Sequence, residues 1–300
     1  MKINRLLFAL PLVWVGLAFF QENDLSNILE SGAKLEKLAG DFKFTEGPSA
    51  DSEGNVYFTD QPNDRIMMWS VKNELSTFMQ PSGRSNGLSF DKAGSLWSCA
   101  DEKNELWIIS PDKKVTVIPS KFEDKVLNGP NDLWIHKNGT VYFTDPYYKR
   151  SWWDHTEKPQ EKQCVYYLSS DHNKIVKIAD DLVQPNGIVG SPDGKNLFVA
   201  DIGANKTWSY TINKDGSLSN KKLFCELGSD GMTIDSKGNI YLTGKGVTIF
   251  DKTGKQIGNI AVPESWTANV CFGGPDMKSL FITASKGLYR IRVKVKGTAG

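Results

Sequence analysis

Six positions along the chain carry a side-chain oxygen in the same setting, just before the apolar residues of an expected strand. These ring positions are Glu46, Asn86, Asn131, Asn186, Asp230 and Asn269. Each is a carboxylate or a carboxamide, and hard cations such as Ca²⁺ prefer ligands of this kind. Two carboxylates would balance one divalent charge. The residue types therefore predict one metal site, provided that the fold brings these positions together.

The same residues have a second interpretation, because Asn-Gly and Asp-Gly pairs often form tight turns. Turn formation does not account for Glu46 before Gly-Pro, for Asn131 before an aspartate, or for carboxylates at only two ring positions. A ring of six residues is too wide for all of them to bind one ion. Three or four protein ligands with water would leave positions open for a substrate.

The segments that carry the ring positions form a sixfold repeat. Each copy has an apolar strand that begins at the ring position, a turn that in most copies is centred on glycine, and a second apolar strand. Successive copies begin between 39 and 55 residues apart, which matches the length of a four-stranded propeller blade. A β-sandwich gives no reason for such repetition. The sequence therefore predicts an all-β fold, a six-bladed β-propeller over residues 33–295.

Closure of the ring is expected to involve the N-terminal part of this domain. The chain ends soon after the third strand of the last repeat, and a strand-like segment, residues 34–39, precedes the first repeat. We expect this segment to supply the missing fourth strand of the last blade. Such pairing removes a free sheet edge and joins the two ends of the chain.

The first 22 residues are typical of a secretory signal peptide. A basic start is followed by an apolar run from Leu6 to Phe20, which Pro11 interrupts and which is short for a membrane-spanning helix of about 20 residues. An uncleaved anchor is the alternative. We expect an exported protein, periplasmic or secreted, with no membrane association once the signal is removed.

Charge and cysteine content narrow the possible partners. Lys+Arg number 36 and Asp+Glu 35, so no strong field favours nucleic acid, and a small-molecule ligand fits better. The four cysteines lie far apart in apolar segments without CxxC spacing, which favours buried free thiols; pairing in an oxidising compartment is the alternative. The sequence leaves the oligomeric state open.

Four motifs resemble one known family. They are Glu46-Gly-Pro, Asn131-Asp132 after Gly-Pro, Pro185-Asn186-Gly187 and Ser229-Asp230-Gly231-Met232. In order and spacing they are similar to the family of regucalcin (senescence marker protein), gluconolactonases and luciferin-regenerating enzyme, with diisopropyl fluorophosphatase as a more distant relative. The resemblance covers about residues 33–295. The chain departs from some members at Gly129, where they carry a substrate-binding arginine.

The resemblance implies the roles of the ring residues. Glu46, Asn186 and Asp230 would bind one divalent metal, with Asn131 as a fourth ligand or a substrate contact beside Asp132. Calcium fits this all-oxygen set best, and zinc and manganese are the alternatives. The expected reaction is hydrolysis of a lactone, with the bound cation as Lewis acid at the ester carbonyl and Asp230 as general base. A hydrolase of other esters or organophosphates, or a non-catalytic ligand-binding propeller, are the alternatives.

A long insertion in the third repeat, residues 146–163, is expected on the same face as the ring. Its aromatic residues include Tyr147 and Trp152, which could form a wall beside the metal and contact a sugar-like or ring-shaped ester. The alternative is that Trp152 and its neighbour Trp153 only pack the insertion onto its blade.

Overall fold

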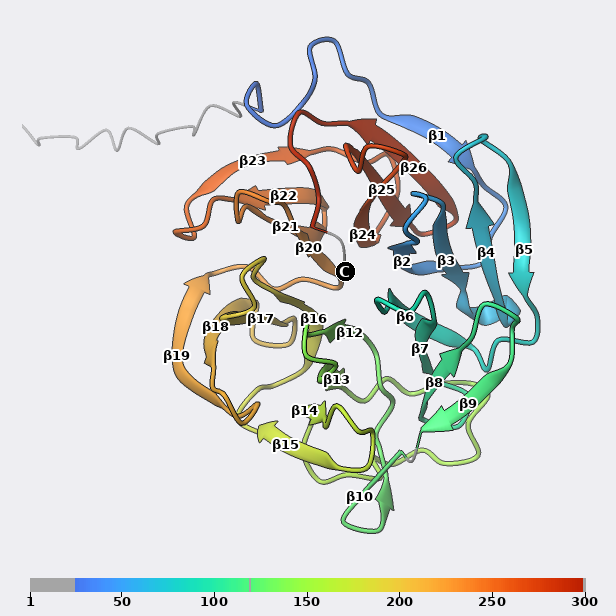
Figure 1. The fold of residues 1–300 in the computed structure, drawn as a ribbon, viewed down its shortest axis with the longest axis vertical. Helices are drawn as coiled ribbons and strands as arrows, with labels where there is room; N and C mark the ends of the chain where they lie inside the picture. The colour runs from blue at the N-terminus through green and yellow to red at the C-terminus, as the bar shows by residue number, and fades with distance from the viewer. Residues whose placement is uncertain (1–24, 119, 299–300) are drawn as a thin grey trace, which may run out of the picture.

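Six four-stranded antiparallel sheets surround a central axis in the computed structural model, which describes residues 25–118 and 120–298 (Figure 1). Blade 1 is β2 (Thr45–Ala50), β3 (Val56–Asp60), β4 (Arg65–Trp69) and β5 (Leu75–Met79), with the 3-10 helix η1 (Gln61–Asn63) after β3. Blade 2 is β6 (Ser85–Phe90), β7 (Leu96–Ala100), β8 (Glu105–Ile109) and β9 (Val115–Ile118). Blade 3 is β12 (Leu133–Ile135), β13 (Val141–Asp145), β14 (Cys164–Leu168) and β15 (Ile175–Ala179).

The second half of the ring repeats this order from the axis outward. Blade 4 is β16 (Pro185–Gly190), β17 (Asn196–Asp201), β18 (Lys206–Ile212) and β19 (Leu218–Cys225). Blade 5 is β20 (Met232–Ile234), β21 (Ile240–Gly244), β22 (Gly246–Phe250) and β23 (Gln256–Ile260). Blade 6 is β24 (Thr267–Gly273), β25 (Ser279–Ala284), β26 (Gly287–Arg292) and, from the start of the domain, β1 (Glu36–Ala39). The predicted six-bladed propeller is confirmed.

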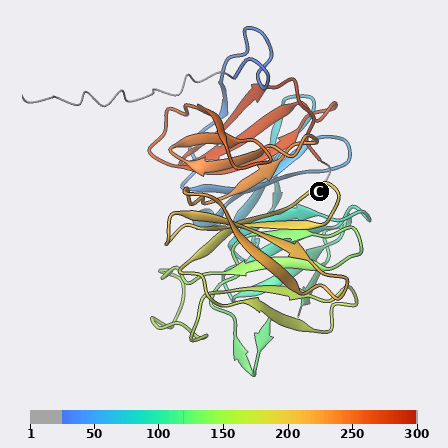
Figure 2. The same cartoon turned by 90° about the vertical axis from the view of Figure 1, so that its left-hand side faces the viewer.

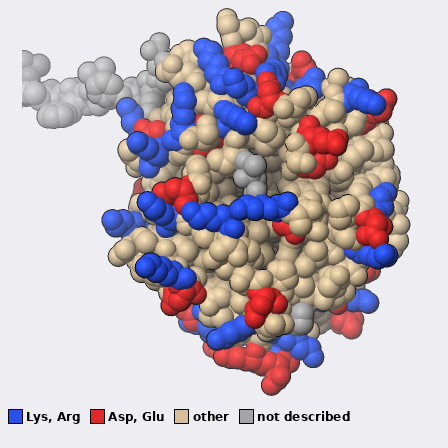
Figure 3. Space-filling view, in the orientation of Figure 1, with Lys and Arg blue, Asp and Glu red and all other residues tan. Residues whose placement is uncertain are grey.

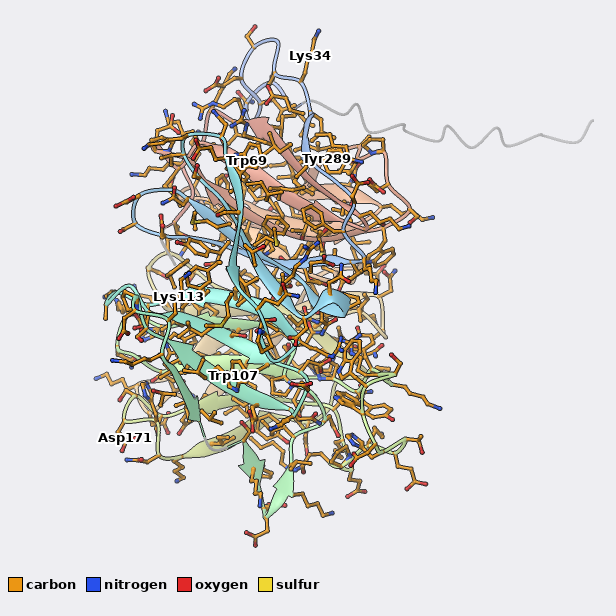
Figure 4. The ribbon with its side chains drawn as sticks, turned by 90° about the vertical axis from the view of Figure 1, so that its right-hand side faces the viewer. Lys34, Trp69, Trp107, Lys113, Asp171 and Tyr289 are labelled. Atoms are coloured by element: carbon orange, nitrogen blue, oxygen red, sulfur yellow. The ribbon has the colours of Figure 1, made fainter. Side chains whose placement is uncertain are left out.

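Strand β1 closes the ring as expected. It pairs antiparallel with β26, Glu36 opposite Arg290 and Lys37 opposite Tyr289, and an ion pair of 2.8 Å joins Glu36 to Arg290. Lys34 and Tyr289 lie at the same end of the molecule, whereas Trp107 of blade 2 lies in its lower half (Figure 4). The outer edge of β26 is therefore covered by a strand from the opposite end of the chain.

The ring positions lie where the inner strands depart from regular pairing. In blades 1, 2 and 4 the register of the inner strand shifts across three positions, which begin at Glu46 in blade 1 and contain Asn86 and Asn186 in blades 2 and 4. In blades 3 and 5 the inner strand begins only after the ring residue. Such irregular backbone re-aims a side chain that regular alternation would place against a neighbouring sheet.

The glycines that follow four ring residues have a packing role. A Cβ on Gly87 would lie 2.5 Å from the carbonyl oxygen of Asn131, and one on Gly187 would lie 2.8 Å from that of Asp230. The Gly87 N–H donates to the same Asn131 oxygen at 2.8 Å. At these four positions, neighbouring inner strands thus approach so closely that a side chain after the ring residue has no room.

Apolar side chains fill the spaces between blades, and each of the six core clusters contains residues of one blade or of neighbouring ones. All four cysteines are buried and free, as expected. No helix of the described residues is long and apolar enough to cross a membrane. The predicted signal segment, residues 1–22, lies outside the described residues. Basic and acidic side chains are interspersed over the face shown in Figure 3.

Two further segments lie outside the six blades. The hairpin of β10 (Lys121–Phe122) and β11 (Lys125–Val126) projects from the rim before blade 3 (Figure 2). The segment after β26 runs to the centre of the ring, where the Ser236 N–H donates to the Lys296 carbonyl at 2.9 Å and the Gly297 N–H to that of Met277 at 2.9 Å (Figure 1). Asp230 precedes β20 and Ser236 follows it. This tail therefore crosses the channel at the mouth opposite to Asp230.

Candidate active site

A polar cavity of about 270 Å³ lies at the mouth of the channel where the inner strands begin. Three predicted residues, Glu46, Asn131 and Asp230, line it, and the fourth, Asn186, hydrogen-bonds to two lining residues. The fold therefore brings the four predicted metal ligands together from blades 1, 3, 4 and 5. Asn86, a ring position to which the resemblance gives no metal-binding role, also lines this cavity.

Asp230 is held in one orientation by a donor on each oxygen. The Trp266 indole N–H donates to Oδ2 at 2.6 Å, and the Asn186 amide donates to Oδ1 at 2.8 Å. Asn186 also donates to the Tyr148 hydroxyl oxygen at 2.8 Å. With its nitrogen used in this way, Asn186 Oδ1 has no hydrogen-bond partner among the described residues and can bind a cation.

Glu46 and Asp230 are two buried carboxyl groups that influence each other. Burial raises the pKa of Glu46 well above its usual value, and the charge of Asp230 raises it further. Burial also raises the pKa of Asp230, against the hydrogen bonds from Trp266 and Asn186 and the positive charge of Arg150. The Gly47 N–H donates to Glu46 Oε2 at 2.9 Å. A cation between the two carboxylates would relieve this desolvation and repulsion.

The donor set fits a hard divalent cation. It offers two carboxylates, the free Oδ1 of Asn186 and the Asn131 amide, which makes no side-chain hydrogen bond to the rest of the described chain. No group of three or more His, Cys, Asp or Glu side chains suited to a metal occurs in residues 25–118 and 120–298. Two of the four ligands are carboxylates and two are amides, all of which offer oxygen. This favours an ion that prefers oxygen ligands over one that prefers imidazole or thiolate.

Asp132 and Asn269 lie deeper, in the channel below the cavity. Both line a separate space between the inner strands, and the Leu133 N–H donates to Asp132 Oδ1 at 2.9 Å. Burial raises the pKa of Asp132 to about 7, against hydrogen bonds from backbone N–H groups and from Asn269. The structure therefore places the predicted substrate contact Asp132 behind the ring, away from the cavity lining.

The insertion over residues 146–163 reaches the cavity through different residues from those predicted. Tyr148 and Arg150 line it, and Tyr147 and Trp152 do not. The Tyr147 hydroxyl donates outward to the Thr156 carbonyl at 2.6 Å. The centre of the Trp152 ring lies 4.7 Å from the Arg84 guanidinium and 5.5 Å from that of Arg150. This irregular segment has no strand alternation from which the inward-facing residues could be read.

Several lining residues were not predicted as site residues. They are Phe44, Gln61, Arg150, Ile202 and Trp266, whereas Tyr148 belongs to the aromatic residues of the insertion that were expected to form a wall. A positional signal was available for some of them. Phe44 and Trp266 precede ring positions by two and three residues, and Gln61 and Ile202 directly follow the second strands of their blades. Both kinds of connection lie at the mouth that the ring positions mark.

The position of Gly129 is closely packed. A Cβ there would lie 3.0 Å from Trp153 Cη2 and 3.0 Å from Asp101 Oδ1. The Trp153 indole donates to the Asp101 carbonyl at 2.7 Å, which fixes the insertion against blade 2. The insertion therefore occupies the space that a side chain at residue 129 would need.

Comparison with known proteins agrees with this architecture. A gluconolactonase of Zymomonas mobilis is 30% identical over 91% of this chain and 85% of its own length. The X-ray structure of a protein assigned as a gluconolactonase is 31% identical, with a TM-score of 0.86 over 92% of this chain and 97% of that one. A gluconolactonase structure from Xanthomonas campestris is 25% identical, with a TM-score of 0.83 over 90% and 92% of the two chains. Residues 44–286 match the family model of the SMP-30/gluconolactonase/LRE-like region, and the chain belongs to this family.

Proposed function

We propose that this protein is a metal-dependent lactonase, with one divalent cation, calcium by preference, held by Glu46, Asn131, Asn186 and Asp230. The observation that carries the proposal is the convergence of these side chains from four blades on one polar cavity. Two of the proteins compared above are named gluconolactonases, which supports the proposal. Zinc and manganese are the alternative ions.

Asp230 is the proposed general base. Its two hydrogen bonds keep the carboxylate directed at the cavity and leave a second lone pair on each oxygen for a water molecule. The hydroxyl of Tyr148 and the ring of Trp266 limit where a substrate ester can lie. When bound, the cation supplies Lewis acidity for the ester carbonyl. The water then loses its proton to Asp230 as it attacks the carbonyl carbon.

The test is an Asp230→Asn variant assayed against a panel of aldonolactones, homoserine lactones, aryl esters and an organophosphate, with calcium, zinc, manganese and no added metal. We expect lactone hydrolysis in the wild type and a loss of about 100-fold or more in the variant, since general-base catalysis contributes on the order of 10²–10⁴. Calorimetry of each metal measures uptake separately. Asp154→Asn is the control, because the Asp154 side chain is fully exposed at 104%.

Each outcome of the panel separates the alternatives. If hydrolysis and metal uptake both survive in Asp230→Asn unchanged, the role of Asp230 is wrong. Hydrolysis confined to the organophosphate or aryl esters would favour an esterase at the same site. If no ester is hydrolysed with any metal, a non-catalytic binding propeller becomes the better interpretation.

Export of the protein, with residues 1–22 as a cleaved signal, is part of this proposal. It is supported by the basic start and the apolar run of the sequence. Cell fractionation with N-terminal sequencing of the mature chain tests it. Full-length protein in the cytosolic fraction would contradict export.

A further inference from the structure

A repeated aspartate ends the second strand of blades 1, 3 and 4 and follows that strand directly in blade 2. These residues are Asp60, Asp101, Asp145 and Asp201. In three of them the carboxylate accepts two backbone N–H groups from the loop that leads into the inner strand of the same blade. The donors are residues 43 and 44 for Asp60, 128 and 129 for Asp145, and 183 and 184 for Asp201, at 2.8–3.3 Å. The repeated aspartate is thus a structural brace for a loop.

Asp101 departs from this pattern. In blade 2 the loop is braced by another residue, Asp64, whose Oδ1 accepts the N–H groups of Ser82 at 2.9 Å and Arg84 at 2.7 Å. Asp101 Oδ2 instead accepts Arg150 Nε at 2.9 Å and the Gln61 amide at 3.1 Å. A side chain that braces a loop elsewhere in the ring here holds an arginine that lines the cavity.

The Arg150 guanidinium is also fixed by aromatic rings. It lies 5.3 Å from the centre of the Tyr148 ring and 5.5 Å from that of Trp152, and Arg84 lies 4.7 Å from the Trp152 ring. Cation–π contacts and an ion pair with a nearly buried carboxylate restrict the side chain to one orientation. Arg150 is therefore placed before any ligand arrives.

The remaining donors of Arg150 are available to a ligand. Nε is used by Asp101, whereas Nη1 and Nη2 have no protein acceptor among the described residues. Two N–H groups in a fixed fork match the two oxygens of a carboxylate. Arg84 does not line the cavity, but it places a second positive charge 4.7 Å from the centre of the Trp152 ring that Arg150 also contacts.

We propose that Arg150 binds a carboxylate on the substrate, so that the enzyme selects lactones that carry a free carboxylate in addition to the ring ester. The inference rests on the proposed lactonase function. Asp101 would be a positioning residue, because it acts through Arg150. The expected substrate class is the monolactone of a sugar dicarboxylic acid, in preference to a neutral aldonolactone of the same ring size.

The test compares these two lactones in the wild type, Arg150→Met and Arg150→Lys. We expect the wild type to prefer the carboxylate-bearing lactone in kcat/KM, and Arg150→Met to lose about 10- to 100-fold on it, mainly through KM, with a clearly smaller loss on the neutral lactone. Arg150→Lys keeps the charge without the fork and should recover part of the loss. Arg290→Met, which removes an ion pair remote from the cavity, is the matched control.

A binding measurement separates this inference from the proposed function. Calorimetry of the open-chain sugar dicarboxylate with metal-loaded wild type and Arg150→Met needs no turnover, and we expect the affinity to fall by a similar factor. An Arg150-dependent affinity without hydrolysis of any lactone would overturn the lactonase proposal and keep the carboxylate site. If Arg150→Met slows both lactones equally, or affects neither, the carboxylate site is wrong. Thermal unfolding of each variant shows whether the fold is intact.

Discussion

Gly231→Ala perturbs the closest approach between neighbouring inner strands. A Cβ on Gly231 would overlap the side-chain amide of Asn269, at its Cγ, Oδ1 and Nδ2 atoms. Asn269 cannot simply rotate away, because its Oδ1 accepts the Val270 N–H at 2.8 Å. Overpacking costs about 1–3 kcal/mol, and a buried N–H left without its acceptor about 1–3 kcal/mol.

These terms place the destabilisation at about 3–5 kcal/mol, a large part of the roughly 5–15 kcal/mol that holds a typical domain folded. For a large domain, each kcal/mol lowers Tm by about 2–4 °C, so we expect a fall of roughly 6–20 °C. Differential scanning calorimetry and urea unfolding measure it. The control is Gly40→Ala, whose Cβ would meet the flexible tip of Lys37, with Cε at 3.1 Å and Nζ at 3.4 Å, and would be in ordinary contact with the Lys286 carbonyl oxygen at 3.8 Å.

A fall in Tm of less than about 2 °C for Gly231→Ala would refute close approach as the reason for the glycine. The turn explanation makes a different prediction, since a turn that needs glycine has a left-handed φ. Of the four glycines that follow ring residues, Gly47 alone has a positive φ, of 41°. Gly231 is therefore the better position at which to separate the two explanations.

Three further perturbations test the site and its support. Trp266→Phe removes the donor to Asp230 Oδ2, so we expect a loss of about 10-fold in kcat with little change in Tm, and an unchanged kcat would contradict a positioning role for the indole. Removal of residues 1–39 exposes the edge of β26, and we expect aggregation in size-exclusion chromatography that removal of residues 1–24 alone does not cause. Burial raises the pKa of Asp145 to about 7, above its unfolded value near 3.9, so its neutral form favours the folded state. Stability from this group is therefore present below about pH 4 and is lost as the pH rises to 7. Over that window, urea titrations should show Asp145→Asn gaining stability relative to the wild type. If the difference in unfolding free energy between the two proteins stays constant with pH, the raised pKa is contradicted.

The fold could be predicted because each blade repeats the same physical problem. Every copy needs an apolar inner strand, a tight turn and a second strand, so six weak signals at one spacing reinforce one another. The closing strand β1 followed from the count of strands in the last repeat. The same repetition located the ring positions, because equivalent residues of a propeller must lie around one axis.

The rest of the site was not predictable from the repeat. Tyr148 and Arg150 belong to an insertion found in one blade, where no periodicity indicates which side chain faces inward. Tyr147 rather than Tyr148 was named as a substrate contact, because the two tyrosines are adjacent and the sequence pattern does not distinguish them. Asp132 was placed near a substrate by its motif, but the direction of its side chain depends on how the inner strand begins after Asn131.

Departures from the repeat are more informative here than the repeat itself. The aspartate that braces a loop in blades 1, 3 and 4 holds Arg150 in blade 2, and a glycine, Gly244, takes its position in blade 5. Gly244 has a φ of 143°, a conformation that glycine adopts readily, and a Cβ there would be in ordinary contact with Trp266 Cη2 at 3.7 Å. Both departures lie beside side chains that line the same cavity. A ring whose blades were identical would have six equal brace positions and no reason for one side of the channel to differ. It is this inequality that brings Arg150 to the cavity that Asp230 also lines.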